Sequence, residues 1–124
     1  MGVLTMPQKI SWDEVEEEQV NPSMKRKMIF GDQVMIAKMK FTDGFLVPLH
    51  NHENEQITQV LSGTIRFWFG NNKEETIDVH AGESLIIPSD LPHEALMIGQ
   101  VEEIDTFSPP RKDWINGSDD YLRE

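Results

Sequence analysis

From Met28 onward the chain consists of short apolar and β-branched runs separated by turn residues such as glycine and asparagine. Successive side chains of an extended strand point to opposite faces, so residues two apart share a face. In residues 34–41 this parity puts an apolar set on one side, made up of Met35, Ala37, Met39 and Phe41. Turn signals recur every eight to twelve residues, which is typical of a β-sandwich or β-barrel. Further strands are expected at residues 56–61, 64–69, 76–80, 84–87, 93–97 and 101–107.

The two ends of the chain lack this strand pattern. Ser11, followed three residues later by Glu14, matches a capping box, which predicts a short helix or an irregular arm near the N-terminus. The basic triplet Lys25–Lys27 is expected to form a solvated edge. The tail after Trp114 is polar and is expected to be loosely ordered, although Trp114 and Tyr121 are able to anchor it.

Composition restricts the function more than the fold. A chain of 124 residues is large enough for one domain with a single core. The net charge of −11 argues against nucleic acid and anionic membranes as partners, because both require basic surfaces. No apolar run approaches the ~20 residues of a membrane span, and the N-terminus lacks the basic-then-apolar order of a secretory signal. A cytoplasmic protein is therefore expected.

Candidate metal ligands lie in residues 44–63, where His50 and His52 share one face of an extended strand. If the strand continues, Gln56 follows on the same side. Because the sequence has no cysteine, any metal site must use nitrogen and oxygen donors. Imidazole suits several first-row divalent metals, but a His-x-His pair alone is common. Pro48 cannot donate a ladder hydrogen bond, so an edge or a bulge is expected just before the histidines.

The spacing around these histidines resembles the first signature motif of the cupin superfamily. That motif reads Gly, five residues, His-x-His, three or four residues, Glu, six residues, Gly. The residues that match are Gly44, His50, His52 and Gly63, with Gln56 at the position of the glutamate.

A second segment resembles the second cupin motif. Gly82, Pro88 and His93 match it, whereas Asp90 replaces its glycine and Met97 replaces its asparagine. The joint resemblance covers roughly residues 34–111 and implies a single-domain, all-β cupin barrel, that is, a double-stranded β-helix or jelly roll with a short N-terminal arm or helix. We accordingly divide the chain into an N-terminal arm (residues 1–27), a barrel (28–112) and a C-terminal tail (113–124).

The resemblance also implies a divalent metal ion, with zinc, nickel, manganese and iron all open as its identity. Its four ligands would be His50, His52, Gln56 and His93. All four are neutral, so the ion would keep its full double charge and act as a stronger Lewis acid than with a glutamate at position 56.

The segment from Asp105 to Arg111 bears on the reaction. Asp105 and Phe107 share a strand face by parity. From the residues alone, an exposed Asp105 and a surface ion pair of Arg111 are the simpler interpretation. The segment, together with the His-x-His-x-x-x-Gln pattern, resembles small cupins of pectin and alginate degradation, which convert 4,5-unsaturated monouronates to linear ketonised sugars. The resemblance implies catalytic roles for Asp105 as general acid–base, Phe107 against the sugar ring and Arg111 on the sugar carboxylate.

Two other functions remain open at this stage. A metal-dependent dioxygenase would consume oxygen and would have a more apolar pocket. A non-catalytic cupin would bind a small sugar or acid without turnover. The expected ligand is a small anionic sugar. Homodimers are common among cupins, so a homodimer formed through Trp68 or the N-terminal arm is also expected.

Overall fold

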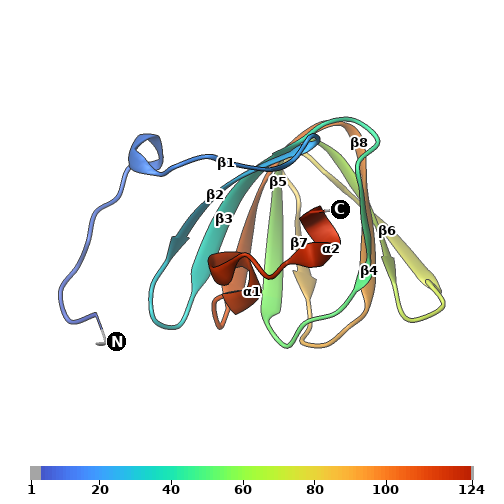
Figure 1. Ribbon diagram of the computed structural model, residues 1–124. Helices are drawn as coiled ribbons and strands as arrows, with labels where there is room; N and C mark the ends of the chain where they lie inside the picture. Colours follow the sequence, from blue (N-terminus) through green and yellow to red (C-terminus); the bar gives the residue numbers. More distant parts are fainter. Residues whose placement is uncertain (1–3, 124) are drawn as a thin grey trace.

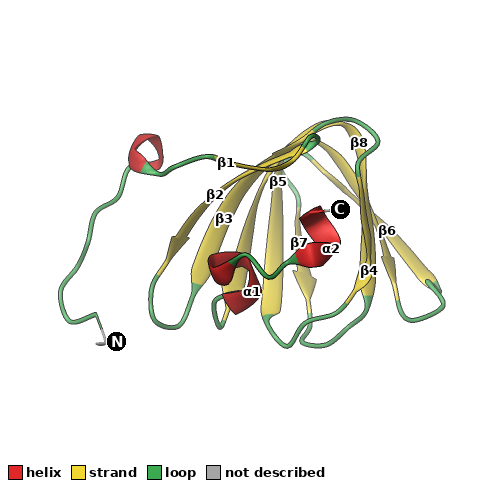
Figure 2. Ribbon diagram, viewed as in Figure 1, coloured by secondary structure: helices red, strands yellow, loops and turns green. Residues whose placement is uncertain are grey.

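Antiparallel strands joined in one continuous sheet make up most of the computed structural model, which describes residues 4–123 (Figures 1 and 2). The strands are β1 (Glu18–Asn21), β2 (Met24–Phe30), β3 (Met35–Phe41), β4 (Leu46–His50), β5 (Glu55–Phe69), β6 (Glu75–His80), β7 (Ser84–Ile87) and β8 (His93–Ser108). The helices are one 3-10 turn, η1 (Trp12–Glu14), and two short α-helices, α1 (Lys112–Asn116) and α2 (Asp120–Arg123). The predicted all-β, single-domain fold is confirmed. None of the helices within residues 4–123 is long and apolar enough to cross a membrane.

The two longest strands, β5 and β8, pair with each other along almost their whole length and shift register near the middle. Gly63 lies at this shift with a φ of 78°, and a Cβ there would lie 2.3 Å from the Gln100 carbonyl oxygen. Only glycine fits such a position. The expectation of two strands joined by a turn at Gly63 was therefore wrong, because the glycine forms a bulge inside one strand. Gly99, with a φ of 78°, occupies the corresponding interruption of β8.

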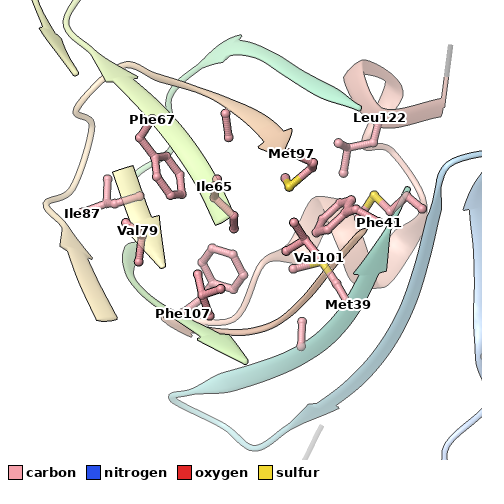
Figure 3. Close-up of a cluster of buried hydrophobic side chains, with 14 of the residues drawn as sticks. Met39, Phe41, Ile65, Phe67, Val79, Ile87, Met97, Val101, Phe107 and Leu122 are labelled. Carbon is pink, nitrogen blue, oxygen red and sulfur yellow. The ribbon is translucent and has the colours of Figure 1, made fainter. Parts of the chain in front are cut away.

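Because β5 and β8 are bent, each contributes to two layers. The first half of β5 and the second half of β8 join β1, β2, β3 and β7, and the other two halves join β4 and β6. The inward side chains of both layers form the core shown in Figure 3. The apolar set predicted for residues 35–41 is buried there, which confirms the parity of β3.

Regular structure begins earlier in the chain than expected. Ser11 does cap a helix, since its Oγ accepts a hydrogen bond from the Asp13 amide at 3.3 Å. The helix is a single 3-10 turn, however, and strand pairing begins at Glu18, inside the segment predicted to be an arm. Before η1 the chain runs outward from the barrel (Figure 1). Residues 1–3 of the predicted arm and residue 124 of the predicted tail lie outside the described residues.

The C-terminal tail is ordered and packs on the barrel, contrary to expectation. Helix α2 contacts β1 of one layer and β4 of the other (Figure 1). Leu122 inserts into the hydrophobic core (Figure 3), and the side-chain amide of Asn21 donates from Nδ2 to the Leu122 carbonyl oxygen at 2.7 Å. The tail therefore bridges the two layers at the side where the histidines lie.

The expectation of a solvated basic edge at Lys25–Lys27 is wrong for Arg26. Strand parity turns Lys25 outward and Arg26 inward, and the Arg26 side chain is 0% exposed. Its guanidinium pairs with Asp119 and Glu18, each at 2.8 Å, and lies 4.6 Å from the centre of the Trp114 ring. This long-range ion pair attaches the tail to β2.

Candidate metal centre

The barrel brings His50, His52 and His93 together. His50 ends β4, His52 follows in the β4–β5 loop, and His93 begins β8 directly opposite His50. One ring nitrogen from each histidine lies within 4.8 Å of the other two. The register of β4 shifts between Val47 and His50, so the bulge predicted from Pro48 is confirmed.

Each of these imidazoles is oriented by a backbone carbonyl. The Nδ1 atom of His50 lies 2.7 Å from the Pro48 oxygen, that of His52 lies 3.0 Å from the Asn54 oxygen, and that of His93 lies 2.8 Å from the Leu91 oxygen. A carbonyl oxygen can only accept, so Nδ1 carries the proton and Nε2 keeps its lone pair. In metal-binding histidines the ring nitrogen that does not bind the metal usually donates such a hydrogen bond, which fixes the orientation of the ring.

The charge state also suits metal binding. Burial lowers the pKa of His50 to about 3, helped by the neighbouring His93. Burial also lowers the pKa of His52 to about 4, with Arg111 adding to the effect, and lowers the pKa of His93. All three rings are therefore neutral near pH 7, which is the form that binds a metal.

Gln56 presents its carboxamide oxygen to this cluster. Gln56 Oε1 lies 3.1 Å from His52 Nε2, while Gln56 Nε2 donates to Thr58 Oγ1 at 2.9 Å. The single proton of a neutral imidazole cannot lie on both ring nitrogens, yet both nitrogens of His52 face an oxygen acceptor. A cation bound jointly by His52 Nε2 and Gln56 Oε1 resolves this conflict. The donor set of three imidazoles and one amide oxygen thus fits a divalent metal ion.

A polar line continues from Gln56 into the barrel. Thr58 donates to Asp105 Oδ1 at 2.6 Å. Asp105 and Phe107 both face inward, which confirms their parity, and the alternative of an exposed Asp105 is wrong because this residue is only 4% exposed. Burial raises the pKa of Asp105 to about 6.

Glu103, which is not among the predicted site residues, faces inward beside Asp105 on the same strand. Glu103 is 4% exposed, and its Oε2 atom has no partner among the described residues. Burial first, and the neighbouring Asp105 second, raise the pKa of Glu103 well above its usual value, which favours the neutral carboxyl group. The signal was available, because positions 103, 105 and 107 share one strand parity.

Arg111 is buried beside the histidines, but one hydrogen-bonding edge of its guanidinium already has partners within the protein. Its Nε and Nη2 donate to the two carboxylate oxygens of Asp113 at 3.0 and 2.8 Å. Nη2 also donates to the Tyr121 hydroxyl at 2.8 Å. The guanidinium covers Phe107, with 5.1 Å to the ring centre. Tyr121, also absent from the sequence-based site, stacks on His50 with ring centres 4.8 Å apart.

Two spaces meet at the histidines. A cavity of about 40 Å³ inside the barrel is lined by Gln56, His93 and Asp105, and this volume suits water molecules. A cleft of about 520 Å³ outside is lined by residues 50–54, 109–113 and Tyr121. The cleft lies within the usual range of small-molecule sites. His50, Arg111 and Tyr121 line both spaces, so these side chains lie at the boundary between the cleft and the cavity that reaches Asp105.

Comparison with solved structures agrees with this architecture. An RmlC-like cupin from Shewanella frigidimarina is 26% identical, with a TM-score of 0.78 over 88% of this chain and 96% of that chain. KdgF from a Halomonas species is 28% identical, with a TM-score of 0.74 over 82% of this chain and 94% of that chain. Oxalate decarboxylase OxdC of Bacillus subtilis shares the fold at 17% identity, with a TM-score of 0.75 over 92% of this chain and 33% of that chain. No curated protein matches significantly.

A family model described as a cupin domain matches residues 37–104, which is more than half of the chain. This segment contains β4 to β7 and most of the pairing between β5 and β8, and it carries the three clustered histidines. The motif resemblance, the two-layered barrel and this match agree, and the chain belongs to the cupin family.

Proposed function

We propose that this protein is a metal-dependent enzyme that converts 4,5-unsaturated monouronates, from pectin or alginate breakdown, to linear ketonised sugars. The observation that carries the proposal is a chain of polar contacts that runs from His52 through Gln56 and Thr58 to Asp105. It joins a candidate metal site, which borders a cleft of ligand size, to a buried carboxyl group on the inner side of the histidines. The motif resemblance of residues 105–111 and the 28% identity to KdgF support the same function.

His50, His52, Gln56 and His93 would hold the ion. Bound there, a divalent ion would supply Lewis acidity toward the oxygens of the sugar acid. Zinc, nickel, manganese and iron all remain compatible with the nitrogen and oxygen donors.

Asp105 is the proposed general acid–base. In ring opening the O–H proton at C1 leaves, the bond between C1 and the ring oxygen breaks, and C4 gains a proton as C5 becomes a ketone. One proton is removed and one is delivered, so a single carboxyl group can serve both steps. A pKa of about 6 suits such a group near neutral pH. The hydrogen bond from the Thr58 hydroxyl fixes the position of Asp105 Oδ1.

Phe107 has a role different from stacking on a sugar in this arrangement. It is 1% exposed and lies edge-on to His52, with ring centres 5.7 Å apart, and beneath Arg111. We propose that Phe107 supports these two side chains. The anionic sugar as partner, the homodimer and the cytoplasmic location remain predictions from the sequence.

The direct test mixes metal-loaded protein with a 4,5-unsaturated monouronate and follows the alkene proton by NMR. Loss of this signal faster than in buffer, and only with metal present, is the expected result. A chelated sample of the same protein is the control. If the metal-loaded protein gives no acceleration, the proposed reaction is wrong, and oxygen consumption and ligand binding without turnover become the next measurements.

A further inference from the structure

The hydroxyl group of Tyr121 has an unusual set of neighbours. Arg111 Nη2 lies 2.8 Å from this oxygen, and Trp114 Nε1 lies 3.1 Å from it. Guanidinium and indole nitrogens donate hydrogen bonds and accept none. The Tyr121 oxygen must therefore accept both hydrogen bonds, which uses both of its lone pairs.

The proton of the same hydroxyl consequently points in a third direction. No residue within the described part of the chain, 4–123, accepts a hydrogen bond from it. Tyr121 lines both the inner cavity and the outer cleft beside His50. An O–H donor without a partner is thus located where a ligand in the cleft would approach the candidate metal ligands.

The family resemblance assigns Arg111 to the sugar carboxylate. The guanidinium edge formed by Nε and Nη2, however, already donates to Asp113. Asp113 takes the paired hydrogen bonds that a ligand carboxylate would need for bidentate binding. The positive charge still acts through Tyr121, because a donor bound to the phenol oxygen polarises the O–H bond and strengthens it as a donor. Arg111 and Tyr121 therefore form one unit in which the phenol offers a donor toward the cleft.

The position of this unit is set by the C-terminal tail. Asp119, two residues before Tyr121, pairs with the buried Arg26 at 2.8 Å, and Leu122, one residue after it, lies in the hydrophobic core. The Trp114 ring lies between the two guanidinium groups, 4.6 Å from that of Arg26 and 4.7 Å from that of Arg111. Anchored residues therefore flank Tyr121 on both sides in the sequence. This fixes the position of the phenol before a ligand binds, which lowers the entropic cost of binding.

We propose that the Tyr121 hydroxyl donates a hydrogen bond to the carboxylate of a uronate bound in the cleft, so that the C-terminal tail supplies part of the substrate-binding site. This inference rests on the proposed function for its ligand. It makes Tyr121 a substrate-binding residue in addition to those that the sequence analysis singled out.

The test compares binding of D-galacturonate, a saturated uronate, to the full-length metal-loaded protein and its variants by calorimetry. Tyr121→Phe removes the hydroxyl but keeps the ring that stacks on His50, so metal content should not change. We expect the dissociation constant to rise roughly 10- to 100-fold, the usual worth of a hydrogen bond to a charged group. A thermal melt establishes that the variant is folded.

Asp113→Asn tests the competing arrangement, in which the ligand displaces Asp113 and pairs with Arg111. Weakening the Asp113 contact would then tighten galacturonate binding, and Tyr121→Phe would have little effect. Under our inference Asp113→Asn does not tighten binding, because the donor is the phenol.

Tyr121 is the single tyrosine of the chain, so tyrosine labelled with ¹³C at Cζ gives one NMR signal. Its shift should change on adding galacturonate, with the same midpoint as the calorimetric titration. If galacturonate binds wild type and Tyr121→Phe equally, or leaves the signal unmoved, the inference is overturned while the proposed function stands. If no uronate, saturated or unsaturated, binds the metal-loaded wild type, both are overturned.

Discussion

The buried Arg26 should be worth far more to stability than an exposed arginine with equally good hydrogen bonds. Arg66 provides the comparison, since it makes a bidentate pair with Asp78 at 2.8 and 3.0 Å on the outer surface. Its side chain is 41% exposed, whereas that of Arg26 is 0% exposed. The same substitution, Arg→Met, removes the charge at either site and keeps much of the side-chain volume.

The expected cost at Arg26 is a balance of several contributions. Removing one partner of a buried ion pair costs about 3–5 kcal/mol, and the low end applies because Asp119 keeps its contact with Arg123 at 2.5 Å. The pair with the partly exposed Glu18 adds about 0–1 kcal/mol and the contact with Trp114 about 0.5–2 kcal/mol. Against these, Arg26 Nε is buried without a partner, and removing it returns about 1–3 kcal/mol. The net loss should be about 3 kcal/mol.

Urea denaturation followed by far-UV circular dichroism and tryptophan fluorescence measures this difference. With a slope of about 2 kcal/mol/M, a loss of about 3 kcal/mol lowers the midpoint by about 1.5 M. Arg66→Met should leave the midpoint nearly unchanged, because exposed ion pairs contribute little to stability. Equal effects of the two substitutions, or a loss at Arg26 below about 1 kcal/mol, would refute the assignment of the tail's anchorage to this side chain.

Three further predictions concern the candidate site. Asp105→Asn should lower turnover of the unsaturated monouronate by about 10²- to 10⁴-fold without loss of metal, whereas Glu102→Gln, on the outer face of the same strand, should leave it unchanged; wild-type rates in the Asn variant would exclude Asp105 from the reaction. Gln56→Glu should tighten metal binding and slow turnover, because a carboxylate cancels one unit of the ion's charge; competition with a chromophoric chelator measures the affinity, and weaker binding would contradict this. Protons compete with metal only below the pKa of each ligand, and burial lowers the pKa of His50 to about 3, that of His52 to about 4 and that of His93 below its ordinary value, so the loss of affinity on acidification should begin below about pH 6.5; a decline that begins at pH 6.5 or above would contradict the burial of these rings.

Strand parity accounts for most of what the sequence predicted correctly. It placed the apolar face of β3 inside and put Asp105 and Phe107 on the same buried face. The same rule applied to β2 would have placed Arg26 inside, beside Met24. The basic composition of residues 25–27 predicts an exposed arginine, whereas strand parity predicts a buried one. Where the two disagreed, the parity was the better guide.

The errors arose where distant segments meet. Gly63 and Gly99 each look like a turn, and only the pairing of β5 with β8 through both positions turns them into bends within strands. The order of the C-terminal tail depends on the contact of Arg26 with Asp119, which lie 93 residues apart in the chain. Local patterns carry no information about such partners. Tyr121 was missed for the same reason, since only the folded tail brings it to Arg111 and His50.

The buried carboxyl groups of Asp105 and Glu103 lower the stability of this barrel, and the proposed acid–base role of Asp105 would explain the presence of that group. The pKa of Asp105 is raised by burial, so the folded state binds its proton more tightly than the unfolded state does, and stability is lost as pH rises from about 4 to about 6. Glu103 adds a second buried acid with an unpartnered oxygen. Apolar residues at both positions would avoid these penalties. The ion pairs and core contacts of the tail offset the cost, and they also place the Tyr121 ring against His50. In this protein, therefore, the segment that stabilises the barrel also completes the proposed site.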